Sequence, residues 1–320
     1  MKRFSFLIIF IVTVFSLVSW VKKIENDSLF KKSTIVFQDQ IVSGSKKSEF
    51  KYQPIKPING KLKGVVELGA SGFNSFIINV DADKNWEIKH KEYGNSFVAE
   101  SATNALEIQN KLKKYIQNII DFGVEADQIH FVISSGAAKV NITKNIKAAL
   151  NKMGYVVNDV TAEQEAQYAL KAVLPQKYEQ TAFVIDIGSG NTKISYVNED
   201  KIIGLETYGA KYFLKNIEDK IVYDDVYTRT KTLPKQRLIQ SFIIGGVPYQ
   251  MAKSLRKGNE RYTVLNKDIS TYEEVVGKKG KKVACGLNIF KAINEASQTN
   301  TVVFDWDANF TIGFLLEQPY

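Results

Sequence analysis

Two short stretches of the chain each place a carboxylate near the end of an apolar strand and follow it with glycines and small residues. In "VVELGASGF", residues 65–73, the acid is Glu67, and in "VIDIGSGNT", residues 184–192, it is Asp186. The two stretches align without a gap, so that Glu67 matches Asp186 and Gly69 matches Gly188. A carboxylate in this position can hold a magnesium ion, or a water molecule, that bridges to phosphate oxygens.

The turns that follow the two acids are suited to phosphate. Glycine permits tight backbone angles and close approach, and exposed N–H groups in such turns form a concavity that binds anions. One copy alone could be an ordinary hairpin turn with a capping acid, but two copies indicate two equivalent units that grip a phosphate chain from both sides. The expected phosphate-binding residues are Gly69, Ala70, Ser71 and Gly72 in the first turn and Gly188, Ser189, Gly190, Asn191 and Thr192 in the second.

Helices and strands are expected to position these turns. Each acid is followed by alternating, strand-like sequence, which predicts that each turn belongs to a β-hairpin. An amphipathic helix is expected to end at Gly123, and another is expected to begin with Thr161 as its N-cap. A helical region is expected from the second hairpin to about Ile221. The remaining expected elements are strand 128–136, helix 142–155, strand 156–160, a strand entering Gly245 and Gly246 with a helix after them, helix 282–296, and a strand and a helix within 301–317.

Composition sets outer limits on the fold and function. The chain has 320 residues, 44% of them hydrophobic, which is enough for two domains or lobes. Its formal net charge of +9 indicates either a basic surface that attracts polyanions or a lysine-rich exterior that keeps the chain in solution. No base-stacking motif, zinc-ligand spacing or basic helix points to nucleic acid. The single cysteine, Cys285, excludes an intramolecular disulfide, and two histidines argue against a histidine metal site.

The N-terminus is expected to be a membrane segment. Residues 4–21 carry no charge, and they are flanked by Lys2 and Arg3 on one side and by Lys22 on the other. We expect residues 1–22 to be an uncleaved anchor. The basic residues on its two sides nearly balance and do not decide its orientation; a short anchor with a basic start favours a domain outside the cytoplasm, on the periplasmic side. The alternative is a cleaved signal peptide and a secreted protein. Residues 23–60 have the composition of a linker.

The order of these elements resembles a known family. The stretches "ELGASGF", "VISSGAAK", "TAEQEA", "IDIGSGNTK", "ACGLNIF" and "VVFDWD" are similar, in that order, to segments of the exopolyphosphatase/guanosine pentaphosphate phosphatase family. That family belongs to the superfamily of actin, sugar kinases and heat-shock-chaperone ATPases. The resemblance covers about residues 61–317. It implies an α/β fold with two ribonuclease-H-like lobes, 61–175 and 176–320, a ligand cleft between them, and a last helix able to return to the first lobe.

The resemblance also implies roles for individual residues. Glu165 is expected to be the general base that activates the attacking water. Asp186 and Glu67 are expected to hold Mg²⁺ or another divalent cation, and Asp186 is also counted as catalytic. Lys139 stands where the family has a phosphate-contacting arginine. The implied activity is the release of phosphate from polyphosphate. Because the turn at Gly245–Gly246 is similar to the adenosine-contacting turn of the superfamily, ATP binding is an alternative.

Four residues depart from the family pattern. Glu67 replaces an aspartate, Gln164 replaces the first of two paired glutamates, Lys139 replaces an arginine, and Lys193 replaces a glutamate and so reverses a charge. Lysine offers phosphate a point charge instead of a bidentate contact. These changes leave open a second class of function, a non-catalytic phosphate or nucleotide sensor or an envelope scaffold. A homodimer also stays open, and no nucleic-acid partner is expected.

Overall fold

The computed structural model describes residues 50–69, 72–93, 105–138 and 141–320. The predicted anchor 1–22 and most of the predicted linker lie outside these residues, as do the predicted phosphate ligands Ala70, Ser71 and Lys139. Among the described helices, none combines the length and the apolar character that a membrane crossing requires.

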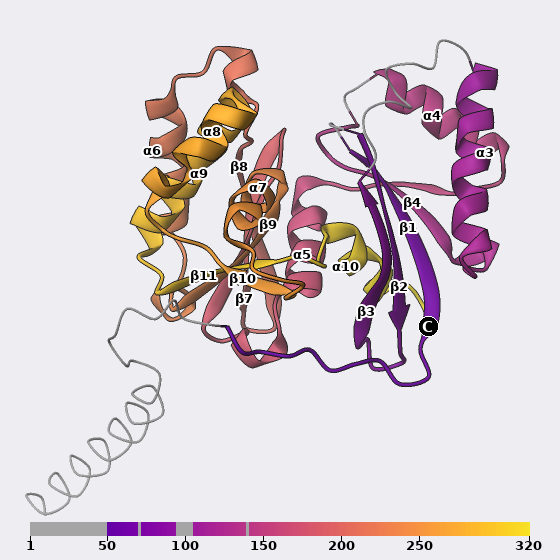
Figure 1. Cartoon of the computed structure of the whole chain (residues 1–320), viewed down its shortest axis with the longest axis horizontal. Helices are drawn as coiled ribbons and strands as arrows, with labels where there is room; N and C mark the ends of the chain where they lie inside the picture. The colour runs from indigo at the N-terminus through magenta and orange to yellow at the C-terminus, as the bar shows by residue number, and fades with distance from the viewer. Residues whose placement is uncertain (1–49, 70–71, 94–104, 139–140) are drawn as a thin grey trace, which may run out of the picture. The chain divides into compact units, whose positions relative to one another are not determined.

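Two β-sheets, which we call the N-terminal and the C-terminal sheet, organise the described chain (Figure 1). The N-terminal sheet has the strand order β3-β2-β1-β4-β5, with β1 (Lys61–Gly69), β2 (Gly72–Val80), β3 (Trp86–Tyr93), β4 (Ile129–Ile133) and β5 (Val157–Asp159). The C-terminal sheet has the order β10-β11-β9-β6-β7-β8, with β6 (Ala182–Ile187), β7 (Asn191–Asn198), β8 (Lys201–Tyr208), β9 (Gln240–Gly245), β10 (Tyr262–Val264) and β11 (Thr301–Asp305).

The two sheets repeat one arrangement. In the first, β1 pairs antiparallel with β2 and parallel with β4, and in the second, β6 pairs antiparallel with β7 and parallel with β9. Each matched acid therefore lies on the strand that joins the hairpin to the rest of its sheet. The prediction of a mixed α/β fold with two equivalent hairpins is confirmed. The helices are α3 (Ala105–Asp121), α4 (Asn141–Lys152), α5 (Ala162–Val173), α6 (Asp219–Lys231), α7 (Gly246–Leu255), α8 (Glu273–Lys279), α9 (Lys281–Ser297) and α10 (Phe310–Glu317).

Alternation along β1 separates two hydrophobic cores. Val66 packs with residues of α3 and α4, such as Leu112 and Leu150, whereas Val65 packs with residues of α5 and α10. Successive strand residues point to opposite faces, so each face of the N-terminal sheet is covered by its own pair of helices. The core that contains α5 and α10 also includes Phe242 of β9, so these two helices are buried against both sheets.

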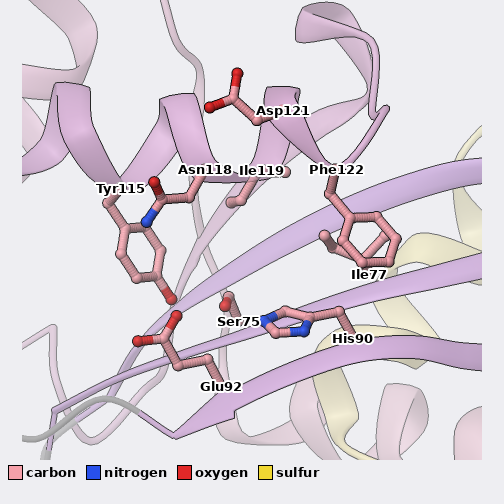
Figure 2. Close-up of a pocket in the computed structure, with 9 residues that line it drawn as sticks. All are labelled: Ser75, Ile77, His90, Glu92, Tyr115, Asn118, Ile119, Asp121 and Phe122. Atoms are coloured by element: carbon pink, nitrogen blue, oxygen red, sulfur yellow. The ribbon is translucent and has the colours of Figure 1, made fainter.

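A pocket of about 440 Å³ lies where α3 crosses β2 and β3 (Figure 2). Its lining includes Ser75 of β2, His90 of β3, Tyr115 of α3 and Phe122, which directly follows that helix. None of the residues predicted to bind phosphate lines it. The pocket is therefore separate from the two matched turns.

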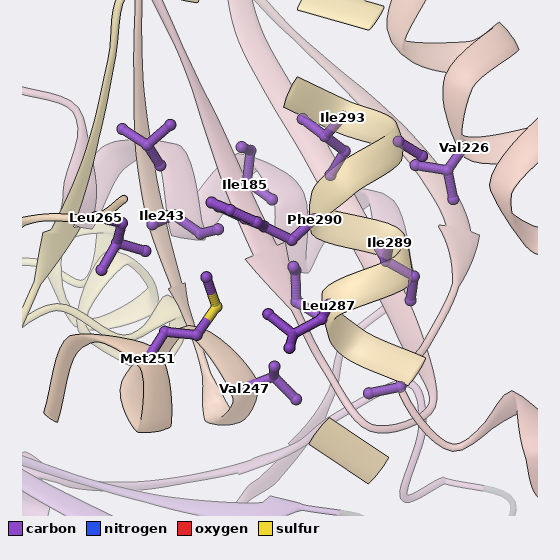
Figure 3. Packing of buried hydrophobic residues seen from close by; sticks show 14 of the residues in the cluster. Ile185, Val226, Ile243, Val247, Met251, Leu265, Leu287, Ile289, Phe290 and Ile293 are labelled. Carbon is purple, nitrogen blue, oxygen red and sulfur yellow. The ribbon is translucent and has the colours of Figure 1, made fainter. Parts of the chain in front are cut away.

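The C-terminal sheet has a third core on its other face. Figure 3 shows Ile185 of β6 and Ile243 of β9 beside Phe290 of α9 and Met251 of α7, and all four side chains are buried. This core fixes the ends of β6 and β9, where the second turn and the Gly245–Gly246 turn begin. Rigid strands with packed helices are a suitable support for a binding site.

The sequence prediction was wrong between the second hairpin and Ile221. That region was expected to be helical, but it contains β8, which pairs with β7, before α6 begins. Most β8 residues are only partly buried, so the strand lacks the clear alternation that would have revealed it. At Gly204 a Cβ atom would lie 2.7 Å from Ala166 Cβ, so the glycine makes room for α5 on this strand.

The contact between α5 and α10 gives a stability prediction. A Cβ atom on Gly313 of α10 would lie 1.9 Å from the carbonyl oxygen of Tyr168 in α5. We therefore expect Gly313→Ala to lower the free energy of unfolding by about 1–3 kcal/mol, because the backbones of α5 and α10 must separate to make room for the methyl group. Gly277→Ala in α8 is the control, since its Cβ would have no neighbour within 4 Å. Urea unfolding measures both, and equal stability of the two variants would contradict this packing.

Candidate functional site

Four charged side chains from four elements lie together in the described structure. They are Glu67 of β1, Glu165 of α5, Asp186 of β6 and Lys193 of β7, and the most exposed of them, Glu67, has only 9% of its surface accessible. Asp186 and Lys193 are direct partners in the β6–β7 register, and the Lys193 ammonium forms an ion pair with Glu165. The charges of Glu165 and Asp186 also act on Glu67. The structure thus brings the proposed base and both matched acids to one place.

The position of Glu165 is set by the first turn of α5. Thr161 caps the helix by accepting a hydrogen bond from the Gln164 N–H at 3.1 Å, and the Gln164 side chain accepts one from the Thr161 N–H at 2.9 Å. This capping box explains why Gln164 can replace a glutamate without disturbing the helix. The Ser135 N–H, in the turn after β4, donates to Glu165 Oε1. Glu165 is therefore oriented from both sides of its carboxylate, by Ser135 and by Lys193.

The second matched turn lies against the turn that holds Ser135. The Asn191 side-chain amide donates to Ser135 Oγ at 3.1 Å and to Glu206 Oε1 at 2.6 Å. A Cβ atom on Gly190 would lie 3.4 Å from Gly136 Cα. Turns from the two sheets thus meet beside Glu165.

Hydrogen bonds from the chain after β8 hold the second turn in place. The Ala210 N–H donates to the Gly188 carbonyl and the Lys211 N–H to the Ser189 carbonyl, both at 2.9 Å. The Gly188 N–H donates to the Asn191 carbonyl at 3.0 Å. Thr192 is fully buried, so its side chain belongs to the packing of β7. Of the predicted phosphate residues in this turn, Gly188, Ser189 and Asn191 therefore have hydrogen bonds within the protein, and Thr192 is buried.

Two asparagines hold the carboxylate of Glu67. Asn74 of β2 donates from its side-chain amide at 2.9 Å, and Asn309, the N-cap of α10, donates at 3.3 Å. Gly69 and Gly72 are partners at the end of the β1–β2 register. Because Asn309 lies 242 residues from Glu67, no local pattern could have revealed its contact. Asn74, Asn309 and Ser135 are the site residues that the sequence did not indicate.

Burial and charge change the pKa values of Glu67, Asp186 and Lys193. Burial raises the pKa of Glu67 to about 7. The hydrogen bond from Asn74 acts to lower this pKa, whereas the charges of Glu165 and Asp186 act to raise it. Burial also raises the pKa of Asp186, which the Lys193 charge opposes. For Lys193, burial acts to lower the pKa, but the carboxylates of Asp186 and Glu165 outweigh it and the pKa is raised. Lys193 is therefore a charged ammonium at neutral pH.

The raised pKa of Glu67 predicts a pH-dependent stability. Because the folded pKa of about 7 exceeds the ordinary value of 4.5, the folded state binds the proton more tightly, and stability falls as pH rises from 4.5 to 7. We expect wild type to lose about 1–3 kcal/mol more than Glu67→Gln across this window, measured by urea unfolding at its two ends. Identical losses in the two proteins would show that Glu67 is not buried as described.

Mg²⁺ does not fit this arrangement of side chains. Its predicted ligands, Glu67 and Asp186, lie around a lysine ammonium that already supplies positive charge. Across the residues that the structure describes, no group of three or more His, Cys, Asp or Glu side chains is placed to hold a metal ion. Mg²⁺ is usually held by one or two carboxylates together with waters and substrate phosphates. What disfavours it here is therefore the charge of Lys193, which already acts on both predicted ligands.

The predicted nucleotide turn lies at the same edge of the C-terminal sheet. Gly245 is the register partner of Ile187 at the end of β6, and its φ of 110° favours glycine. A Cβ atom there would lie 2.4 Å from the Ile187 carbonyl oxygen. Gly246 begins α7, and a Cβ on it would lie 3.9 Å from Lys282 Nζ. A helix N-terminus and a lysine thus adjoin the second turn, which suits an anion.

Comparison with known proteins identifies the fold. The chain matches no protein-family model and no curated protein sequence. A Ppx/GppA family member from Aquifex aeolicus superposes with a TM-score of 0.61 and 16% identity, over 80% of this chain and 96% of that one. An exopolyphosphatase from Cytophaga hutchinsonii gives a TM-score of 0.60 and 11% identity over 80% and 96% of the two chains. The described part of the chain therefore has the fold of the Ppx/GppA exopolyphosphatases, as its sequence motifs predict.

Proposed function

We propose that the chain is a phosphoanhydride hydrolase of the exopolyphosphatase type, which releases phosphate from the end of a polyphosphate chain. The observation that carries this proposal is the position of Glu165, a buried carboxylate held by the Ser135 N–H and Lys193 where the two sheets' turns meet. The likeness in fold to exopolyphosphatases supports the substrate class.

The proposed reaction is an in-line attack of water on the terminal phosphorus. Glu165 accepts a proton from the water while a bond forms between the water oxygen and the phosphorus. The bond from that phosphorus to the bridging oxygen breaks, and inorganic phosphate is released. The turn N–H groups and Lys193 balance the charge of the phosphate oxygens, which is most of what phosphoryl transfer requires from a protein. The bound phosphate competes with Glu165 for the Lys193 ammonium, and this frees the carboxylate to act.

The proposal is tested by measuring phosphate release from polyphosphate by the full chain. We expect inorganic phosphate to accumulate while the remaining chain shortens from its ends. ATP and guanosine pentaphosphate, assayed in parallel, separate polyphosphate from nucleotide substrates. Polyphosphate that binds but stays intact over many hours would contradict the hydrolase.

The second candidate function is phosphate or nucleotide binding without turnover. The observation that favours it is the ion pair between Lys193 and Glu165, because a lysine replaces the family's glutamate beside the proposed base. Lys282 near Gly246 favours a nucleotide as the ligand of such a sensor or scaffold. Saturable binding of ATP or polyphosphate without phosphate release is the expected result for this function.

We also propose that residues 1–22 anchor the chain, with its α/β domain outside the cytoplasm. The support is the uncharged run of residues 4–21, flanked by basic residues. Membrane fractionation with protease treatment of intact cells tests it. Recovery of a soluble form that lacks these residues would instead indicate a cleaved signal peptide.

A further inference from the structure

Lys193 is a buried cation that pairs with one acid and interacts with the charges of two more, from three other elements. Its side chain is 6% exposed, and its ammonium pairs with Glu165. Asp186 is its register partner, and the charge of Glu67 also acts on it. A Cβ atom on Gly188 would lie 3.7 Å from Lys193 Nζ, so the ammonium also lies beside the second turn. One side chain therefore pairs with the proposed base, lies opposite Asp186 and beside the predicted phosphate-binding turn, and interacts electrostatically with Glu67.

The place of this ammonium is the place that a divalent cation would need. A metal bound to Asp186 and Glu67 would lie close to Lys193 Nζ, and like charges repel strongly in a buried site where solvent screens them little. If a metal ion displaced the Lys193 ammonium from these acids, Glu165 would also lose its ion-pair partner. Metal and lysine are thus alternatives for the same carboxylates.

We propose that Lys193 is a resident cation that replaces the divalent metal, so that this site binds a phosphate chain without Mg²⁺. The phosphate ligand rests on the proposed function, whereas the exclusion of metal rests on the geometry alone. A lysine ammonium offers three donors on a flexible stem, which allows it to contact phosphate oxygens and carboxylates together. The N–H groups of the second turn can supply further contacts.

The exclusion of metal is tested with Mn²⁺ as the probe, in metal-free buffer without phosphate. The electron paramagnetic resonance signal of free Mn²⁺ falls when the ion binds to the full chain. We expect wild type and Asp186→Asn to bind Mn²⁺ equally weakly, without saturation. Lys193→Glu, which exchanges the cation for a ligand, is expected to bind Mn²⁺ at least about tenfold more tightly than wild type. Wild-type binding that Asp186→Asn abolishes would overturn the proposal, and this comparison does not depend on the folding of Lys193→Glu.

The phosphate part is tested by binding of end-labelled polyphosphate to the full chain in EDTA and in Mg²⁺. We expect wild-type affinity to be the same in both, and Lys193→Gln, checked for folding by circular dichroism, to bind at least about tenfold more weakly in EDTA. Wild-type binding only in Mg²⁺ would overturn the proposal. Absence of polyphosphate binding in either buffer would contradict the proposed function, while the Mn²⁺ titration would still decide the role of Lys193.

Discussion

Glu165→Gln is expected to lower the rate of phosphate release from polyphosphate by about 10²–10⁴-fold, because a positioned general base contributes that much to a rate. Glutamine keeps the size of the side chain and its acceptor for the Ser135 N–H. It cannot accept the proton of the attacking water. Polyphosphate affinity is expected to stay within a few-fold, since binding rests on the turns and on Lys193, which keeps Asp186 as a partner. Initial rates and binding, measured on the same preparation, separate the two effects.

The matched control is Glu163→Gln on the same helix. Glu163 lies in the first turn of α5, two residues before Glu165, but it is exposed. The same chemical change at Glu163 is expected to leave the rate of phosphate release unchanged. If both variants release phosphate as fast as wild type, Glu165 is not the base. If neither they nor wild type release any, the binding-only function is the better description.

The fold was predictable to the extent that its signals are local. An acid, an apolar residue and a glycine recur in "ELG" and "DIG", and each stretch pairs with the strand that directly follows it in the chain. The N-cap Thr161 is likewise a short-range signal, and the structure confirms it. β8 was missed because an incompletely buried strand has little hydrophobic alternation, and its assignment depends on pairing with β7.

The site was predictable only in part, because its chemistry depends on contacts between elements. The sequence indicated Glu165, Asp186 and Glu67 but not the hydrogen bond from Asn309, which comes from the last strand-to-helix turn. For Lys193, the sequence showed only that a lysine replaces the glutamate of the family pattern. That the ammonium pairs with Glu165 follows only from the packing of α5 on β7. Spacing in sequence cannot state which partner a buried lysine has.

Lys193→Met is expected to lower the free energy of unfolding at neutral pH by about 3–5 kcal/mol, the usual loss when one partner of a buried ion pair is removed. Methionine preserves much of the apolar stem, so the loss is assigned to charge. Glu165 and Asp186, both buried, would then lie together without a cation. Lys171→Met is the matched control, because Lys171 pairs with Glu317 between α5 and α10 but is solvent-exposed. There the expected loss is at most about 1 kcal/mol.

The double variant Glu165→Gln/Lys193→Met distinguishes a charge effect from a packing effect. Removing both charges eliminates the uncompensated Glu165 carboxylate, so the double variant is expected to be more stable than Lys193→Met alone by about 1–3 kcal/mol. Part of the loss is expected to remain, because Asp186 still faces the uncharged side chain. Urea unfolding of wild type, both single variants and the double variant gives the coupling energy directly. Simple additivity of the two single losses would mean that Lys193 and Glu165 do not interact, and the ion pair at the centre of this site would have to be abandoned.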